Sequence, residues 1–216
     1  GSLLIDNAGQ LQSATARVGE AASAQHVIAL RGGSSWNVWG TIYLGTVSQG
    51  NLVVSDGSTM TSSDAVLAEG PNTYGIASVS GIGSSWNAGE DLIVGRRGTG
   101  QLFIQDDGQA QAEYLTIGEN SDGVGTVVVH GDGAQLLVDY SIDVGEEGQG
   151  LLTIANNGYV SSTDIARIGR EAGSSGAVEL LSEGRWDHAG ILVVGAHGEG
   201  YLTIDAESEV NSASAV

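Results

Sequence analysis

Charged side chains recur about once every 25 residues along this 216-residue chain, each time just after a short apolar run. The series contains Glu69, Arg96, Arg97, Glu119, Glu146, Glu147, Arg170, Glu171 and His197. If each step lies above the previous one, Arg96 lies between Glu69 and Glu119. Arg170 likewise lies above Glu146. Such a column predicts solvated ion pairs, each worth ~0–1 kcal/mol.

A second interpretation of this column is a calcium site. Glu119 and Glu146 would face each other across one step, with Asp122 and Glu147 close by. Carboxylates that converge at about 5 Å repel one another unless a cation bridges them, and Ca²⁺ takes carboxylate and carbonyl oxygens. The glycine- and aspartate-rich nonapeptide of calcium-binding β-rolls does not occur. Calcium is the one cofactor that the sequence suggests, and otherwise we expect none.

Three tryptophans share one register of apolar positions. Trp36, Trp86 and Trp186 are spaced as members of one repeat, and Leu136 stands at the fourth place. Smaller side chains alternate with them, as interdigitated core layers require. We therefore expect these tryptophans in the core.

Other polar and aromatic side chains are candidates for binding. Trp39, Tyr43 and Tyr74 lie outside the apolar registers, so we expect them on the surface. Asp187 and His188 form a polar pair beside a core tryptophan. These five residues are the predicted binding residues, and stacking of a sugar on an exposed ring is the chemistry that they suggest.

Catalytic chemistry has weaker support. The closest approaches to an active site are Asp187-His188 and Glu90-Asp91, and neither has a third orienting group at a readable spacing. The four histidines fall in unrelated registers and form no metal set. No repeat carries an insertion long enough to build a wall around a pocket. We therefore expect a protein that is not an enzyme.

Composition excludes several classes of partner and fold. The formal net charge is −19, and every basic residue is arginine. Nucleic acid is excluded as a partner because phosphate binding needs a basic surface. No apolar run approaches the ~20 residues that span a bilayer, so this segment does not insert into a membrane. Hydrophobic residues make up 41% of the chain, which is too many for a disordered acidic tail.

Glycine marks an internal repeat. Gly45, Gly95, Gly145 and Gly195 are 50 residues apart, and a second glycine follows five residues after each of them. Apolar residues between the glycines are spaced i, i+2, which is the period of a strand and not of a helix. The chain is therefore all-β. Glycine, Asp and Asn are expected at corners where positive φ is needed.

Each 50-residue unit divides into two related halves of about 25 residues, and each half holds three short strands. We predict a single-stranded right-handed parallel β-helix (a β-solenoid) of about eight and a half coils. Strand spacing of ~4.8 Å makes this a rod about 40 Å long. Residues 1–216 would form one continuous solenoid with units starting near 1, 50, 100, 150 and 200. A sandwich or propeller is the competing fold.

The combined pattern resembles a known bacterial repeat. G-x-L-x-I and L-x-V-G-x-x-G-x-G recur along the chain, together with G-x-G-S-x-W, which is clearest in residues 81–95, varied in residues 32–45 and lost in the third and fourth units. This pattern is similar to the autotransporter-associated (PEP-CTERM-associated) repeat of type V secreted passenger domains. The resemblance implies a stalk on the surface of a Gram-negative bacterium, attached to the outer membrane or secreted, usually in adhesins, with no catalytic residues. It also leads us to expect a fragment of a longer repeat array.

The sequence thus predicts a structural, adhesive segment that serves as stalk and binding surface. Its partner would be a host-cell or matrix glycan, a protein, or another copy of the chain. The alternative is a carbohydrate-active enzyme or a glycan-binding module on the same scaffold.

Overall fold

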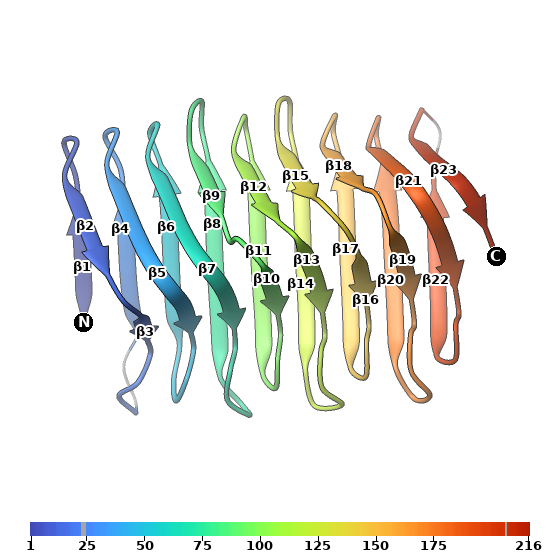
Figure 1. Ribbon diagram of the computed structural model, residues 1–216, viewed down its shortest axis with the longest axis horizontal. Coiled ribbons are helices and arrows are strands. Elements are labelled where there is room, and N and C mark those ends of the chain that lie inside the picture. The colour runs from blue at the N-terminus through green and yellow to red at the C-terminus, as the bar shows by residue number, and fades with distance from the viewer. Residues whose placement is uncertain (23–24, 206) are drawn as a thin grey trace.

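The computed structural model describes residues 1–22, 25–205 and 207–216, and these form a parallel β-solenoid (Figure 1). The described residues contain strands and turns but no helix. They make two sheets that face each other, and every strand pairing is parallel. The predicted all-β solenoid fold is therefore confirmed.

Sheet 1 has nine strands, one from each coil. In spatial order they are β1 (Ser2–Ile5), β4 (His26–Leu30), β6 (Gly50–Ser55), β8 (Tyr74–Ser80), β11 (Thr99–Gln105), β14 (Val124–His130), β17 (Gln149–Ala155), β20 (Ser175–Leu181) and β22 (Glu199–Ile204).

Sheet 2 has fourteen strands. It contains the second and third strands of each coil, and it bends where these two strands meet. Its strands are β2 (Gln10–Ser13), β3 (Ala16–Val18), β5 (Ser35–Leu44), β7 (Thr59–Leu67), β9 (Ser85–Asn87), β10 (Asp91–Val94), β12 (Gln109–Ala112), β13 (Tyr114–Ile117), β15 (Gln135–Val138), β16 (Ile142–Val144), β18 (Tyr159–Ser162), β19 (Ile165–Ile168), β21 (Arg185–Val194) and β23 (Glu209–Ala215).

The three strands expected in each coil are not always separate. In β5, β7, β21 and β23 the second and third strands run on as one, because pairing with neighbouring coils continues on both sides of a register shift. These shifts fall between Val38 and Thr41 and between His188 and Ile191. We call this place in each coil the bend.

The core lies between the sheets and is built from stacked columns. In the third coil Leu52 and Val54 point inward from sheet 1, and Met60 and Leu67 point inward from sheet 2. The predicted tryptophan column is confirmed by the strand registers. It runs Leu11, Trp36, Met60, Trp86, Ala110, Leu136, Val160, Trp186 and Val210.

The glycine pairs form the turns that lead back into sheet 1. Gly95 has φ of +79°, in the region that side chains disfavour. Gly100, five residues later, packs on it so closely that an added Cβ would lie 2.1 Å from the Gly95 nitrogen. At the other corner Asp106, Asp107 and Asn156 adopt positive φ, as expected for Asp and Asn at corners.

Nothing among the described residues forms a helix long and apolar enough to cross a membrane.

Candidate functional site

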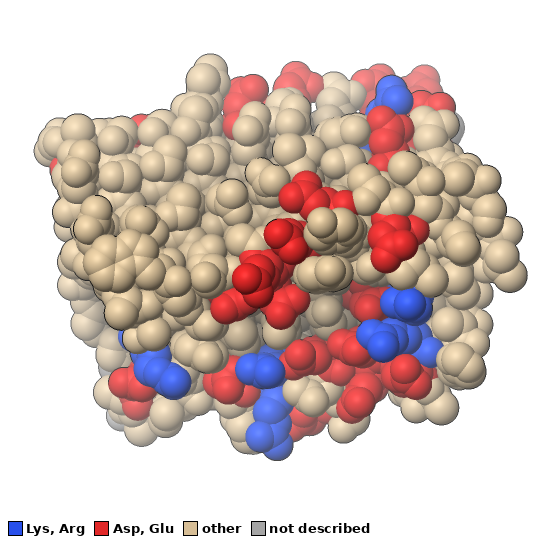
Figure 2. All heavy atoms as spheres, in the orientation of Figure 1, with Lys and Arg blue, Asp and Glu red and all other residues tan. Residues whose placement is uncertain are grey.

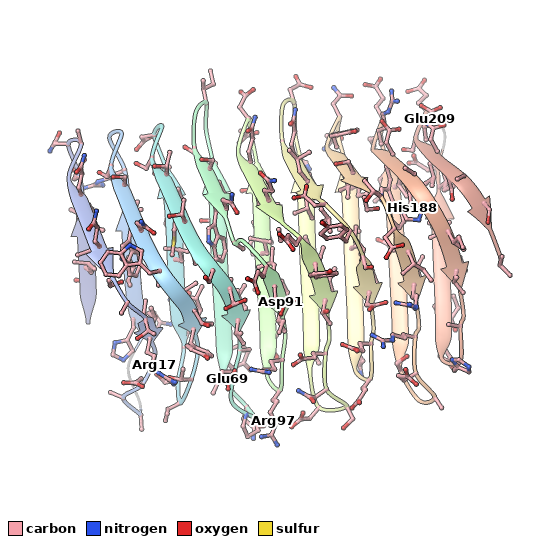
Figure 3. The ribbon with its side chains drawn as sticks, in the orientation of Figure 1. Arg17, Glu69, Asp91, Arg97, His188 and Glu209 are labelled. Carbon is pink, nitrogen blue, oxygen red and sulfur yellow. The ribbon has the colours of Figure 1, made fainter. Side chains whose placement is uncertain are left out.

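The predicted column of charges exists, and ion pairs link its steps. Arg96 lies between two carboxylates, with its Nη1 3.1 Å from Glu69 and its Nε 2.8 Å from Glu119. Arg97 approaches Asp122 at 3.9 Å. Figure 3 shows Glu69 and Arg97 among the turns at the lower end of the strands.

A second ion-pair cluster follows two coils later. Arg170 contacts Glu146 at 2.5 Å and Asp143 at 2.9 Å, and Arg167 contacts Asp143 at 3.2 Å. Asp143 is buried beneath these two guanidinium groups. Burial raises the pKa of Glu146, and the charge of Arg170 works against this rise.

Arginine side chains contact three of the four predicted calcium ligands. Glu119 is held by Arg96, Glu146 by Arg170, and Asp122 lies near Arg97. Within the described ranges no group of three or more His, Asp or Glu side chains converges as metal ligands do. The structure therefore does not assemble Glu119, Asp122, Glu146 and Glu147 into one carboxylate cage.

The three predicted surface aromatics do not form one site. Trp39 stands at the bend of β5 and is 61% exposed. Tyr43 lies on the outer face of the same strand, where the Arg17 guanidinium covers its ring at 4.5 Å. Tyr74 is exposed at the start of β8 in the other sheet, beside a hollow that Pro71 and Arg97 help to line.

Asp187 and His188 point to opposite faces of β21, as neighbours in a strand must. His188 is buried, and its Nδ1 lies 2.8 Å from the Ser162 hydroxyl, which also accepts a hydrogen bond from Trp186. Asp187 instead lies on the outer face and accepts hydrogen bonds from Arg185 and Asn211. The structure therefore does not bring this pair into one site.

Opposing effects set the pKa of Asp187. Burial raises it, but hydrogen bonds from Arg185 and Asn211 outweigh burial, so the pKa lies below its ordinary value.

An aromatic pair that was not predicted from the sequence lies on the outer face of sheet 2. Tyr114 and Tyr140 stack with ring centroids 5.3 Å apart and an interplanar angle of 25°. They are 43% and 45% exposed, so the stacked pair is accessible to solvent. Their signal was an acid-Tyr dipeptide that recurs one coil later, at Glu113-Tyr114 and Asp139-Tyr140.

Carboxylates follow the bend on both sides of this tyrosine pair. They are Asp64, Glu90, Asp91, Glu113, Asp139 and Asp164. No described arginine forms an ion pair with any of the six, whereas Glu69, Glu119 and Glu146 of the turn column are paired with arginines. Figure 2 shows them as a red band across the middle of this face, apart from the mixed red and blue band along the turns.

The carboxylates of the bend influence each other. Burial raises the pKa of Asp91, the charge of Asp64 raises it further, and Arg96 lowers it. In Figure 3 Asp91 lies near the middle of the front sheet.

We call the outer side chains along the bend the bend surface: Trp39, Tyr114, Tyr140 and the six carboxylates. It is hollowed near both ends. One hollow of about 400 Å³ is lined by Trp39, Ser63 and Glu90, and another of about 660 Å³ by Thr163, Asp187 and Asn211. Both are open to solvent. The surface can therefore stack an extended ligand on rings and accept its hydrogen bonds, but it encloses no reacting group.

Comparison with known proteins yields little. No family model matches the sequence, and no curated protein matches it. Among solved structures, the chain is similar to the crystal structure of a TibA fragment that was hyper-glycosylated by TibC. The identity is 16%, the match covers 98% of this chain and 100% of the other, and the TM-score is 0.21.

Proposed function

We propose that this chain is a structural and adhesive segment of a β-solenoid at the surface of a Gram-negative bacterium. It acts as a stiff stalk, and its sides bind a glycan or protein of another cell, of the matrix, or a second copy of the rod. The repeat resemblance supports the location. The bend surface is the observation that carries the adhesive role.

The chemistry of the bend surface restricts the classes of ligand that it can bind. Exposed rings stack on the apolar faces of sugars, and carboxylates accept hydrogen bonds from hydroxyl groups. Six carboxylates without arginine partners repel an anionic glycan. The favoured ligands are therefore neutral glycans, with basic protein segments as the second choice. No calcium is needed for either.

Beads coated with the purified chain should adhere to epithelial cells and bind neutral glycans on an array. The double variant Tyr114→Ser/Tyr140→Ser should weaken binding about tenfold, as expected for loss of ~1.4 kcal/mol. Tyr43→Ser/Tyr74→Ser removes two tyrosines away from the bend and is the matched control. Equal loss in both variants, or no binding by the unchanged chain, would contradict the proposal.

The enzyme alternative receives no specific support, since Asp187 and His188 lie on opposite faces. Degradation of a polysaccharide that is abolished by Asp187→Asn would nevertheless favour it.

A further inference from the structure

Sheet 1 is almost free of charge, although the chain carries 26 acidic residues. Its first seven strands in spatial order, β1 to β17, contain no Asp, Glu, Lys or Arg. Only Glu179 in β20 and Glu199 in β22 bring carboxylates into this sheet. The acidic residues lie instead in the turns and on sheet 2. We call the outward side chains of these seven strands the uncharged face.

The uncharged face has an apolar centre. Val53, Phe103 and Val128 stand in one column of the parallel registers, and Ile76 and Leu151 stand in the adjacent column. All five are half-buried by neighbours on the same flat sheet. Polar residues lie between them: Ser78 separates Val53 from Phe103 in the first column, and Gln101 and Thr126 separate Ile76 from Leu151 in the second.

The inner face of sheet 1 packs on sheet 2, so its outer face is left to solvent. Contiguous apolar patches on soluble proteins mark sites of interaction. The outer face of sheet 1 therefore calls for a partner that is also flat and uncharged.

We propose that the uncharged face pairs with the same face of a second copy, with the two rods antiparallel. This deepens the function proposed above by naming the second copy as the partner of one face. Seven strands at ~4.8 Å, each about 20 Å long, give a face of about 670 Å² on each rod. Two such faces together bury about 1,340 Å², which lies within the ~1,200–2,000 Å² of stable protein interfaces.

The distribution of charge favours both the face through which the two rods pair and their antiparallel direction. Two rods of −19 each repel unless they meet where they carry no charge. A two-fold axis near Phe103, in the fifth of nine strands, places Val53 of one copy opposite Thr153 of the other. It also places each Glu179 opposite an uncharged strand. Parallel rods would instead bring the two Glu179 side chains together.

Sedimentation velocity over a wide range of concentration tests the pairing. The unchanged chain should form dimers whose dissociation constant falls as salt is raised, because screening weakens the repulsion between the rods. Phe103→Glu should raise the dissociation constant at least about tenfold. Leu137→Glu is the matched control, since Leu137 is a half-buried apolar residue on the outer face of sheet 2. A monomer at all concentrations, or equal effects of both variants, would overturn the proposal.

Disulfide formation gives a second readout that does not depend on the glutamate variant folding well. The chain contains no cysteine. Under mild oxidation, a mixture of Val53→Cys and Thr153→Cys chains should form a mixed dimer, whereas Val53→Cys alone should not. The opposite pattern would overturn the antiparallel arrangement. Because this test uses purified chain, it can fail while adhesion through the bend surface stands, and adhesion can fail while pairing stands.

Discussion

Each core tryptophan is matched to a serine of the preceding coil. Trp36, Trp86 and Trp186 donate their indole N–H to Ser13, Ser62 and Ser162 at 3.1, 3.4 and 3.0 Å, respectively. A buried indole needs such an acceptor, because an unpaired N–H in the core is costly. The tryptophan column was predictable from its register. The serine column beside it gave no comparable apolar signal, so the pairing emerges only from the structure.

Ser162 should therefore matter more than its outward neighbour Ser161. Ser162→Ala leaves Trp186 and His188 without this partner, and should lower the free energy of unfolding by about 1–3 kcal/mol. Ser161→Ala, on the outer face of the same strand, should change it by less than about 0.5 kcal/mol. Urea unfolding followed by tryptophan fluorescence measures both, and equal midpoints would contradict the pairing.

Asp91 and Asp187 should respond to neutralisation with opposite signs. The pKa of Asp91 is raised in the folded chain. Above that pKa the charge of Asp91 therefore destabilises the fold, and this destabilisation decreases as pH falls toward 3.8. The pKa of Asp187 is lowered, so its stabilisation is present above 3.8 and is lost as pH falls through the folded value.

At pH 7, Asp91→Asn should thus raise the melting temperature and Asp187→Asn should lower it, each by a few degrees. Both differences should shrink as the pH is lowered from 7 to 3, because the unchanged carboxyls take up protons. Melting curves by circular dichroism at pH 7 and pH 3 check this. Equal signs at pH 7 would count against the electrostatic account of the bend.

At the scale of the element, alternation along a strand explains most of what the sequence predicted. The i, i+2 spacing placed Leu52, Val54 and Met60 in the core. The same rule, applied from Trp186, puts His188 inward and Asp187 outward, so their placement on opposite faces was predictable from the sequence. The capture of Asp143 by two arginines was not predictable, because long side chains reach across columns in ways that a repeat period does not encode.

The turn between the sheets offers a test at the same scale. Gly100→Ala would drive a Cβ to 2.1 Å from the Gly95 nitrogen, where only backbone can yield. Gly33→Ala would force an alanine into the φ of +72° that Gly33 adopts, but its added Cβ would meet no atom within 4 Å. We expect Gly33→Ala to cost about 1–2 kcal/mol and Gly100→Ala to cost more, because it must shift a coil. Thermal unfolding ranks them, and the reverse order would contradict the stacking of the glycine pairs.

At the scale of the molecule, the two sheets have different surfaces. Sheet 1 is uncharged over most of its length, while the bend surface of sheet 2 combines rings with carboxylates that lack arginine partners. In the turns that connect the two sheets, ion pairs link successive coils. We propose that the rod binds its partners through its sides, with sheet 1 facing a second copy and the bend surface facing a ligand.

Small-angle X-ray scattering of the concentrated chain tests this claim most directly. Pairing through the uncharged face should leave the longest dimension of the particle close to that of the single rod, and should about double the shortest one. Phe103→Glu should restore the profile of the single rod. A longest dimension that doubles would mean association through the ends and would contradict the account, as would a single-rod profile at every concentration.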